Sequence, residues 1–173
     1  MLLRIGEKII NRQKIYQVVD EALELRSKGL SQQEVANKVG IDRTVISKLE
    51  TLGEIRKGGR IALVGFPIKN CSELETVAGQ QGIDYCLLMS ERERWDYVES
   101  KSGVQLFNDI MQIIAMLRQY DVVIMLGSNM RIKLMETLLD KEVIGIEIGE
   151  SPIAEDKYVD PNKLLTIISQ LRF

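Results

Sequence analysis

The chain contains no histidine, the side chain that most often moves protons near neutral pH. It also lacks a nucleophile elbow and the cysteine and arginine spacing of a phosphatase loop. Neither the glycine fingerprint of a dinucleotide site nor a Gly-Lys-Ser/Thr phosphate loop is present. Because the usual sources of acid–base and nucleophilic chemistry are missing, we expect a protein that is not an enzyme and that uses no cofactor.

Cysteine is almost as scarce as histidine. Cys71 and Cys86 have no metal-ligand spacing, so we expect no metal site and two reduced thiols, with Cys86 in the core. No apolar run approaches the length of about 18 residues that a membrane span needs. Charged residues at Arg4, Glu7 and Lys8 interrupt the first apolar residues and argue against a signal peptide, so a cytoplasmic location is expected.

Charge is divided unequally along the 173 residues, of which 45% are hydrophobic and 28% are charged. Residues 1–60 carry 12 Lys/Arg against 8 Asp/Glu, a balance of +4, whereas residues 61–173 carry 11 against 17, a balance of −6. A basic N-terminal part can approach phosphates while the acidic part faces away. Since +4 is modest, non-specific affinity for a nucleic acid should be weak and sensitive to salt, and two copies would strengthen it.

Residues 30–49 contain two short helical patterns separated by Gly40, which is the layout of a helix-turn-helix. Apolar residues recur at helical spacing in both patterns, and this predicts two faces that pack together. These residues are Val35, Ala36 and Val39 in the first helix and Val45, Ile46 and Leu49 in the second. Gly40 stands where the chain must reverse and where a positive φ angle is easiest without a side chain.

The starts of both short helices are marked in the sequence. Ser31 and Glu34 have the spacing of a capping box, and Asp42 is placed to cap the second helix. A further helical pattern over residues 12–28 completes a three-helix unit. Residues 1–10 are amphipathic and too short to stand alone, so they dock either on the second domain or on a second subunit.

The residues left outside this predicted core form a polar outer face. Arg43 can donate two hydrogen bonds to guanine, and Thr44 can offer a methyl group to thymine or a hydroxyl group to a base. Amide side chains at the N-terminus of the first helix can hold a phosphate. The side chains predicted to contact DNA are Gln32, Gln33, Arg43, Thr44, Ser47 and Lys48.

The segment resembles the Xre/Cro family of phage-repressor-like helix-turn-helix proteins. Their pattern of Ser-Gln-x-x-x-Ala-x-x-x-Gly followed by Ile-Ser-x-x-Glu is matched here by Ser31, Gln32, Ala36, Gly40, Ile46, Ser47 and Glu50. The resemblance implies a DNA-binding regulator of transcription. The family's usual close of Glu-x-Gly is replaced by Glu50-Thr51-Leu52-Gly53. The alternative is an ordinary α-hairpin that touches no nucleic acid.

Two interpretations compete for residues 54–63. In one, Glu54–Arg56 and Ile61–Leu63 are strands of a wing turned at Gly58-Gly59. In the other, residues 57–59 are a linker and a new domain begins with a strand over residues 60–66. We favour the second interpretation because a continuous apolar run is typical of a strand buried on both faces, whereas a wing strand would alternate.

The predicted domains are therefore a helix-turn-helix domain over residues 1–56, the linker, and an α/β domain over residues 60–173. In this second domain, apolar runs alternate with helical patterns. The runs cover residues 60–66, 85–90, 121–127 and 143–149, and the helical patterns cover residues 71–82, 91–119 and 129–140, followed by a last helix capped by Asp160 and begun by Pro161. This rhythm predicts a doubly wound, Rossmann/flavodoxin-like sheet of about four parallel strands in the order 2-1-3-4. The apolar residues between 107 and 117 belong to the core or to a dimer face.

Open parallel sheets bind ligands at the carboxyl ends of their strands. There the sequence places Gly65 after the first strand and the segment Gly127, Ser128, Asn129 and Arg131 after the third. This segment can bind an anion through backbone N–H groups and a positive side chain. The alternative is that Ser128 or Asn129 simply caps a helix.

The sequence as a whole predicts a sequence-specific transcriptional regulator that binds double-stranded DNA as a homodimer. Its α/β domain would bind a small-molecule effector, mediate dimerisation, or both. A second hypothesis is a small α/β enzyme whose N-terminal helices serve as an assembly module. A third is a non-regulatory DNA module such as a partition or phage factor.

Overall fold

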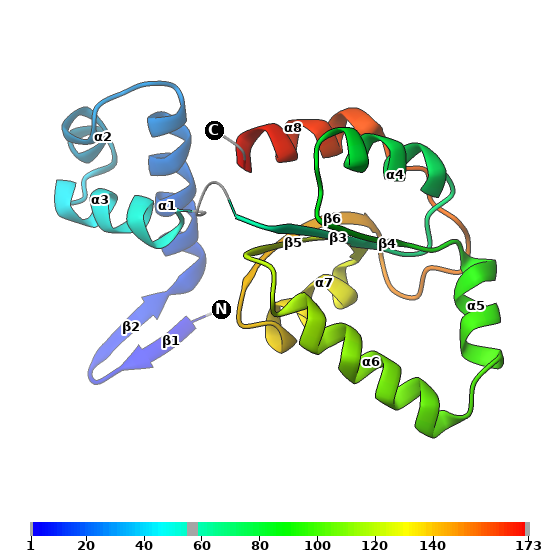
Figure 1. Cartoon of the computed structure of the whole chain (residues 1–173). Coiled ribbons are helices and arrows are strands. Elements are labelled where there is room, and N and C mark those ends of the chain that lie inside the picture. The colour runs from blue at the N-terminus through cyan, green and yellow to red at the C-terminus, as the bar shows by residue number, and fades with distance from the viewer. Residues whose placement is uncertain (1, 55–58, 172–173) are drawn as a thin grey trace. The chain divides into compact units, whose positions relative to one another are not determined.

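The computed structural model describes residues 2–54 and 59–171 (Figure 1). The chain forms two compact units, Met1–Glu54 and Ile55–Phe173. The predicted linker, residues 57–59, lies largely outside the described residues, as does the wing strand predicted at its N-terminal side.

The N-terminal unit is a β-hairpin followed by three helices. Its elements are β1 (Leu2–Ile5), β2 (Lys8–Asn11), α1 (Arg12–Ser27), α2 (Gln32–Val39) and α3 (Arg43–Leu52). The helices confirm the three-helix prediction. The hairpin was not predicted: its antiparallel strands pair Leu3 with Ile10, and Gly6 turns the chain with a φ of 59°. Apolar side chains at Leu2, Ile5 and Ile9 remain exposed on it.

A small core holds the three helices together. Its buried residues are Ala22 of α1, Val35 and Ala36 of α2 and Ile46 of α3. The prediction that Val45 shares this core is wrong, because Val45 is 44% exposed while Ile46 is 0% exposed. The two side chains point about 100° apart on α3, and Ile46 is the one that packs against Ala22, Val35 and Ala36.

The predicted caps of α2 and α3 are confirmed. The Ser31 hydroxyl accepts from the Glu34 backbone N–H, and the Ser31 backbone N–H donates to the Glu34 carboxylate at 2.8 Å. Gly40 ends α2 in the left-handed conformation, with a φ of 74°. The Asp42 carboxylate accepts from the Thr44 backbone N–H at 2.7 Å and starts α3.

The C-terminal unit contains a parallel sheet with the predicted strand order. Its strands are β3 (Ile61–Gly65), β4 (Tyr85–Leu88), β5 (Val122–Ser128) and β6 (Glu142–Gly149), arranged as β4-β3-β5-β6. In order along the chain this is 2-1-3-4. Because β3 pairs in parallel with β4 and β5, the interpretation of Ile61–Leu63 as a wing strand is wrong.

Helices cover both faces of this sheet. They are α4 (Cys71–Gln80), α5 (Glu91–Glu99), α6 (Gly103–Leu117), α7 (Asn129–Leu138) and α8 (Pro161–Leu171). Figure 1 shows α4 and α8 on one face and α6 and α7 on the other. The doubly wound, Rossmann/flavodoxin-like fold is therefore confirmed. The predicted cap of the last helix is also confirmed, since the Asp160 carboxylate accepts from the Asn162 backbone N–H at 2.9 Å.

Alternate residues of the central strands fill two separate cores. Ile61 and Leu63 belong to the core under α4 and α8, whereas Ala62 and Val64 belong to the other. Cys86 packs against the first core, as predicted, and burial raises the pKa of its thiol to about 11. Among the described residues, no helix is both long and apolar enough to cross a membrane.

The apolar residues of α6 divide between core and surface. Leu117 is buried in the second core, and Ile113 and Ile114 pack against it. Phe107 and Met111 are 63% and 51% exposed. The helix therefore covers the sheet with its C-terminal half and presents apolar side chains to solvent from its N-terminal half.

Candidate nucleic-acid interface and ligand pocket

The outer face of α3 carries the residues that the sequence predicted for base contacts. Arg43, Thr44, Ser47 and Lys48 are all exposed, on the side of α3 away from buried Ile46. A helix with its side chains is about 10–12 Å across, and the major groove of B-DNA is about 12 Å wide. The shape and chemistry of this face therefore suit insertion into a major groove.

A polar network holds α2 and α3 in position. The Glu50 carboxylate accepts from Arg26 Nε and, at 2.7 Å, from Gln32 Nε2. Gln32 Oε1 in turn accepts from Arg43 Nε at 3.5 Å. The hydrogen bonds from Arg26 and then Gln32 lower the pKa of Glu50 below its usual value of 4.5. Gln32 thus ties the helices together, and Arg43 keeps its terminal guanidinium N–H groups for other partners.

The other predicted DNA contacts differ in how they are engaged. Gln33 is exposed at the start of α2 and donates to Asn37 Oδ1 at 3.1 Å. The Thr44 hydroxyl donates to Asp42, which leaves its methyl group as the outward apolar contact. In the part of the chain that the structure describes, no residue pairs with the side chain of Lys48. Base and phosphate contact by these residues stays a prediction.

An apolar flank beside the polar face was missed by the sequence prediction. Val45 is 44% exposed, and Leu52, two turns further along α3, is 84% exposed. Small apolar groups at this position can contact the thymine methyl group in a major groove. The sequence pattern offered no clear signal for this, because neighbouring helix residues can share a core, as Val35 and Ala36 do.

Net charge contributes little to the described helices. Residues 1–54 carry nine Lys/Arg and eight Asp/Glu, a balance of +1. The rest of the excess predicted for residues 1–60 comes from Arg56, Lys57 and Arg60, and the first two lie outside the described residues. Attraction to phosphate must therefore come mainly from the positions of individual basic side chains and from the partial positive charge at the N-termini of the helices.

The predicted ligand residues after β3 and β5 are largely used in packing and capping. A Cβ on Gly65 would lie 2.8 Å from Leu126 Cβ, so this glycine lets strands and side chains approach closely. The Ser128 hydroxyl accepts from the Arg131 backbone N–H at 3.4 Å and caps α7. Asn129 Oδ1 accepts from the Ser151 backbone N–H at 3.3 Å. Gly127 lies at the irregularity in the pairing of β5 with β6.

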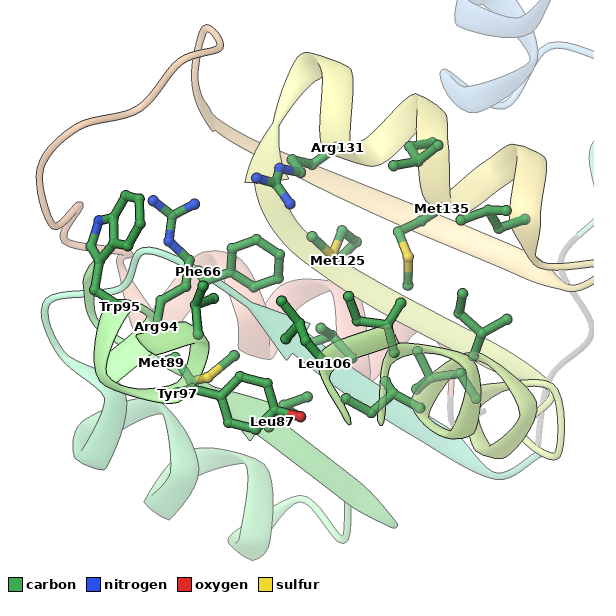
Figure 2. Close-up of a pocket in the computed structure, with 18 residues that line it drawn as sticks. Phe66, Leu87, Met89, Arg94, Trp95, Tyr97, Leu106, Met125, Arg131 and Met135 are labelled. Atoms are coloured by element: carbon green, nitrogen blue, oxygen red, sulfur yellow. The ribbon is translucent and has the colours of Figure 1, made fainter. Parts of the chain in front are cut away.

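Arg131, the last of the predicted ligand residues, lines a cavity of about 410 Å³ between the sheet, α5, α6 and α7. The sequence placed a candidate ligand site at this end of the strands, but it did not foresee the apolar walls, because they come from residues spread between 64 and 138. Figure 2 shows Phe66, Arg94 and Trp95 gathered at one end, with the guanidinium of Arg131 turned toward them. Aliphatic and methionine side chains make up most of the remaining wall.

The two arginines at the polar end are in different electrostatic situations. Arg94 donates to Glu91 Oε1 at 2.6 Å, and Trp95 Nε1 donates to the same oxygen at 2.8 Å. The Arg131 guanidinium lies 5.1 Å from the centre of the Phe66 ring and has no carboxylate or carbonyl partner among the described residues. Partial burial, and then the positive charge of Arg94, lower the pKa of Arg131. The charge of Glu91 acts in the opposite direction, so in the described part of the chain the two arginines share one carboxylate and the polar end keeps an excess of one positive charge.

The geometry of the N-terminal unit defines its class. Two capped helices that meet across a left-handed glycine, supported by a third helix, make a helix-turn-helix. Residues 21–55 match the helix-turn-helix family model, which confirms the Xre/Cro-like resemblance for this part of the chain and supports a DNA-binding regulator. No curated protein and no solved structure matches the chain significantly.

Proposed function

We propose that the protein is a sequence-specific transcriptional regulator that binds DNA as a homodimer and responds to a small molecule bound by its α/β unit. We propose no catalytic role for that unit. The observation that carries the proposal is the division of α3 between Ile46, which is 0% exposed, and an outer face of exposed polar side chains.

Recognition would place α3 in the major groove. Arg43 would donate to guanine, and Thr44 and Val45 would contact thymine methyl groups beside it. Lys48, one turn later on the same face, would reach a base or a phosphate. The N-terminus of α2 and the exposed amide of Gln33 would hold the DNA backbone and set the register.

The proposed dimer uses the exposed apolar stripe of α6. Val104, Phe107 and Met111 are 73%, 63% and 51% exposed and follow one another at helical spacing. A second copy of the chain is the occupant that the charge argument favours, because a balance of +1 gives one helix-turn-helix little attraction for phosphate. Two copies double the contacts and place two recognition helices about 34 Å apart on a two-fold site.

The dimer is tested by Phe107→Glu, measured by sedimentation equilibrium. A charge at the centre of the stripe should shift the protein to monomer and weaken DNA binding by about tenfold or more. Gln112→Glu is the matched control, since this residue is also exposed on α6 but lies off the stripe. Dimerisation through α6 is excluded if Phe107→Glu and Gln112→Glu associate equally well.

The function itself is tested by selecting bound sequences from random DNA duplexes at a stated salt concentration. We expect a roughly palindromic motif whose half-sites are about one helical turn apart. Enrichment of a single half-site would contradict binding as a homodimer but would support sequence-specific binding. Recovery of random sequences would contradict the proposal that the protein is a sequence-specific regulator.

A further inference from the structure

We infer that the cavity between the sheet, α5, α6 and α7 binds an amphipathic organic monoanion, with a carboxylate at Arg131 and an aliphatic body along the inner face of α6. The binding site is argued from the C-terminal unit alone. Its role as an effector site rests on the proposed function.

The cavity has the size and the walls for the apolar part of such a molecule. Its volume of about 410 Å³ lies within the range of about 300–1,000 Å³ that small-molecule sites have. The wall away from the arginines is aliphatic and includes Leu87, Leu106, Ile110, Ile113, Ile114 and Leu138. Tyr97 also lies along this wall (Figure 2), and its hydroxyl already donates to Asp109 at 2.9 Å, so an aliphatic chain would bury its surface there without leaving that polar group unpaired.

The polar end selects the charge of the ligand. Arg94 and Arg131 share one nearby carboxylate, Glu91, which pairs directly with Arg94, so among the described residues this end of the cavity keeps an excess of one positive charge. Arg131 lies in the first turn of α7, whose N-terminal end adds positive potential. The partly desolvated guanidinium of Arg131 is best matched by one carboxylate, which it can bind through two hydrogen bonds.

The position of α6 can couple ligand binding to dimerisation, because this helix borders both the cavity and the proposed dimer stripe. The half-buried Ile113 and Ile114 line the cavity together with the more exposed Ile110, while Phe107 and Met111 lie on the proposed dimer stripe. A polar clasp joins α6 to α5, since the Asp109 carboxylate accepts from Tyr97 Oη at 2.9 Å and pairs with Lys101. A ligand that favours one position of α6 would shift the monomer–dimer equilibrium and, through it, DNA affinity.

The binding test uses the purified full chain without DNA. Calorimetric titration with decanoate should show one site per chain, and decan-1-ol, which has no charge, should bind about tenfold or more weakly. Arg131→Gln should weaken decanoate binding by a similar factor, and Arg131→Lys should restore part of it because the charge returns. Arg92→Gln is the matched control on α5, where the Arg92 side chain is 90% exposed and outside the cavity wall; it should bind decanoate as the unmodified chain does.

The outcomes separate the ligand site from the regulator. Equal binding of decanoate and decan-1-ol, or unchanged decanoate binding in Arg131→Gln, would overturn the charge selection. Absence of binding for carboxylates from octanoate to tetradecanoate would overturn the site. The titration contains no DNA, so it tests the site independently of the proposed function. If the chain binds decanoate but selects no DNA sequence, the ligand site is supported and the proposed function is contradicted.

Discussion

The two units are stabilised in different ways. The described part of the N-terminal unit has only four buried core residues, and the helix caps and the Arg26–Glu50–Gln32 network supplement them. The C-terminal unit has two larger cores but leaves a cavity against one face of its sheet. The small unit therefore has few core contacts that it can lose, whereas the large unit tolerates an unfilled apolar cavity.

The largest difference in stability between the two units is expected for Ile46→Ala. Ile46 is fully buried in the small core, so truncation should cost about 2–5 kcal/mol of the stability of the three helices. Amide hydrogen exchange in the full chain should then speed up in α1–α3 and stay unchanged in β3–β6. Val45→Ala, next to it but exposed, should change little. Equal acceleration in both units would show that they do not unfold independently.

Gly65→Ala tests how tightly the sheet of the C-terminal unit is packed. The added Cβ would lie 2.8 Å from Leu126 Cβ and 3.0 Å from Leu88 Cδ2, so β3 or its neighbours must shift. We expect a loss of about 1–3 kcal/mol, measured by urea unfolding followed through Trp95 in α5. An unchanged urea midpoint would show that the sheet is more loosely packed than the structure indicates.

A smaller effect is expected from Glu50, and it depends on pH. Because the pKa of Glu50 is lowered in the folded unit, its stabilisation is present above the ordinary value of 4.5 and is lost as pH falls through the lowered value. Glu50→Gln should therefore destabilise the three helices at pH 7 more than at pH 3, as followed by the amide NMR signals of α1–α3 in urea. Glu34 and Asp42, whose pKa values are also lowered, titrate in both proteins and cancel in the difference. The same urea midpoint difference at both pH values would exclude a charged role for Glu50.

The smallest expected change is a gain of stability from Gly79→Ala. Gly79 lies in α4, and no atom is within 4 Å of the position that its Cβ would take. Alanine should therefore stabilise the C-terminal unit by about 0.4–1 kcal/mol, the opposite sign to Gly65→Ala. Thermal unfolding of the two variants side by side measures this contrast, and a loss of stability in Gly79→Ala would contradict the open space around Gly79.

The units also differ in how far the sequence could predict them. The caps at Ser31 and Asp42 and the turn at Gly40 act over a few residues, so local spacing was enough to place α2 and α3. The strand order followed from general rules of chain crossover. The hairpin before α1 was missed because its apolar residues bury little surface and leave no clear alternation. A ligand site at the carboxyl ends of the strands was predicted, but its apolar wall could not be, since residues such as Leu87 and Leu106 line one cavity only after distant segments fold together.

The central claim, that the outer face of α3 recognises bases, is tested most directly by Arg43→Ala on the duplex obtained by selection. We predict a loss of about 1–3 kcal/mol that is confined to one base position of each half-site. Lys28→Ala, which removes an exposed charge at the end of α1, is the matched control and should leave base preference unchanged. Unaltered base preference in Arg43→Ala, with the protein still folded, would contradict the account.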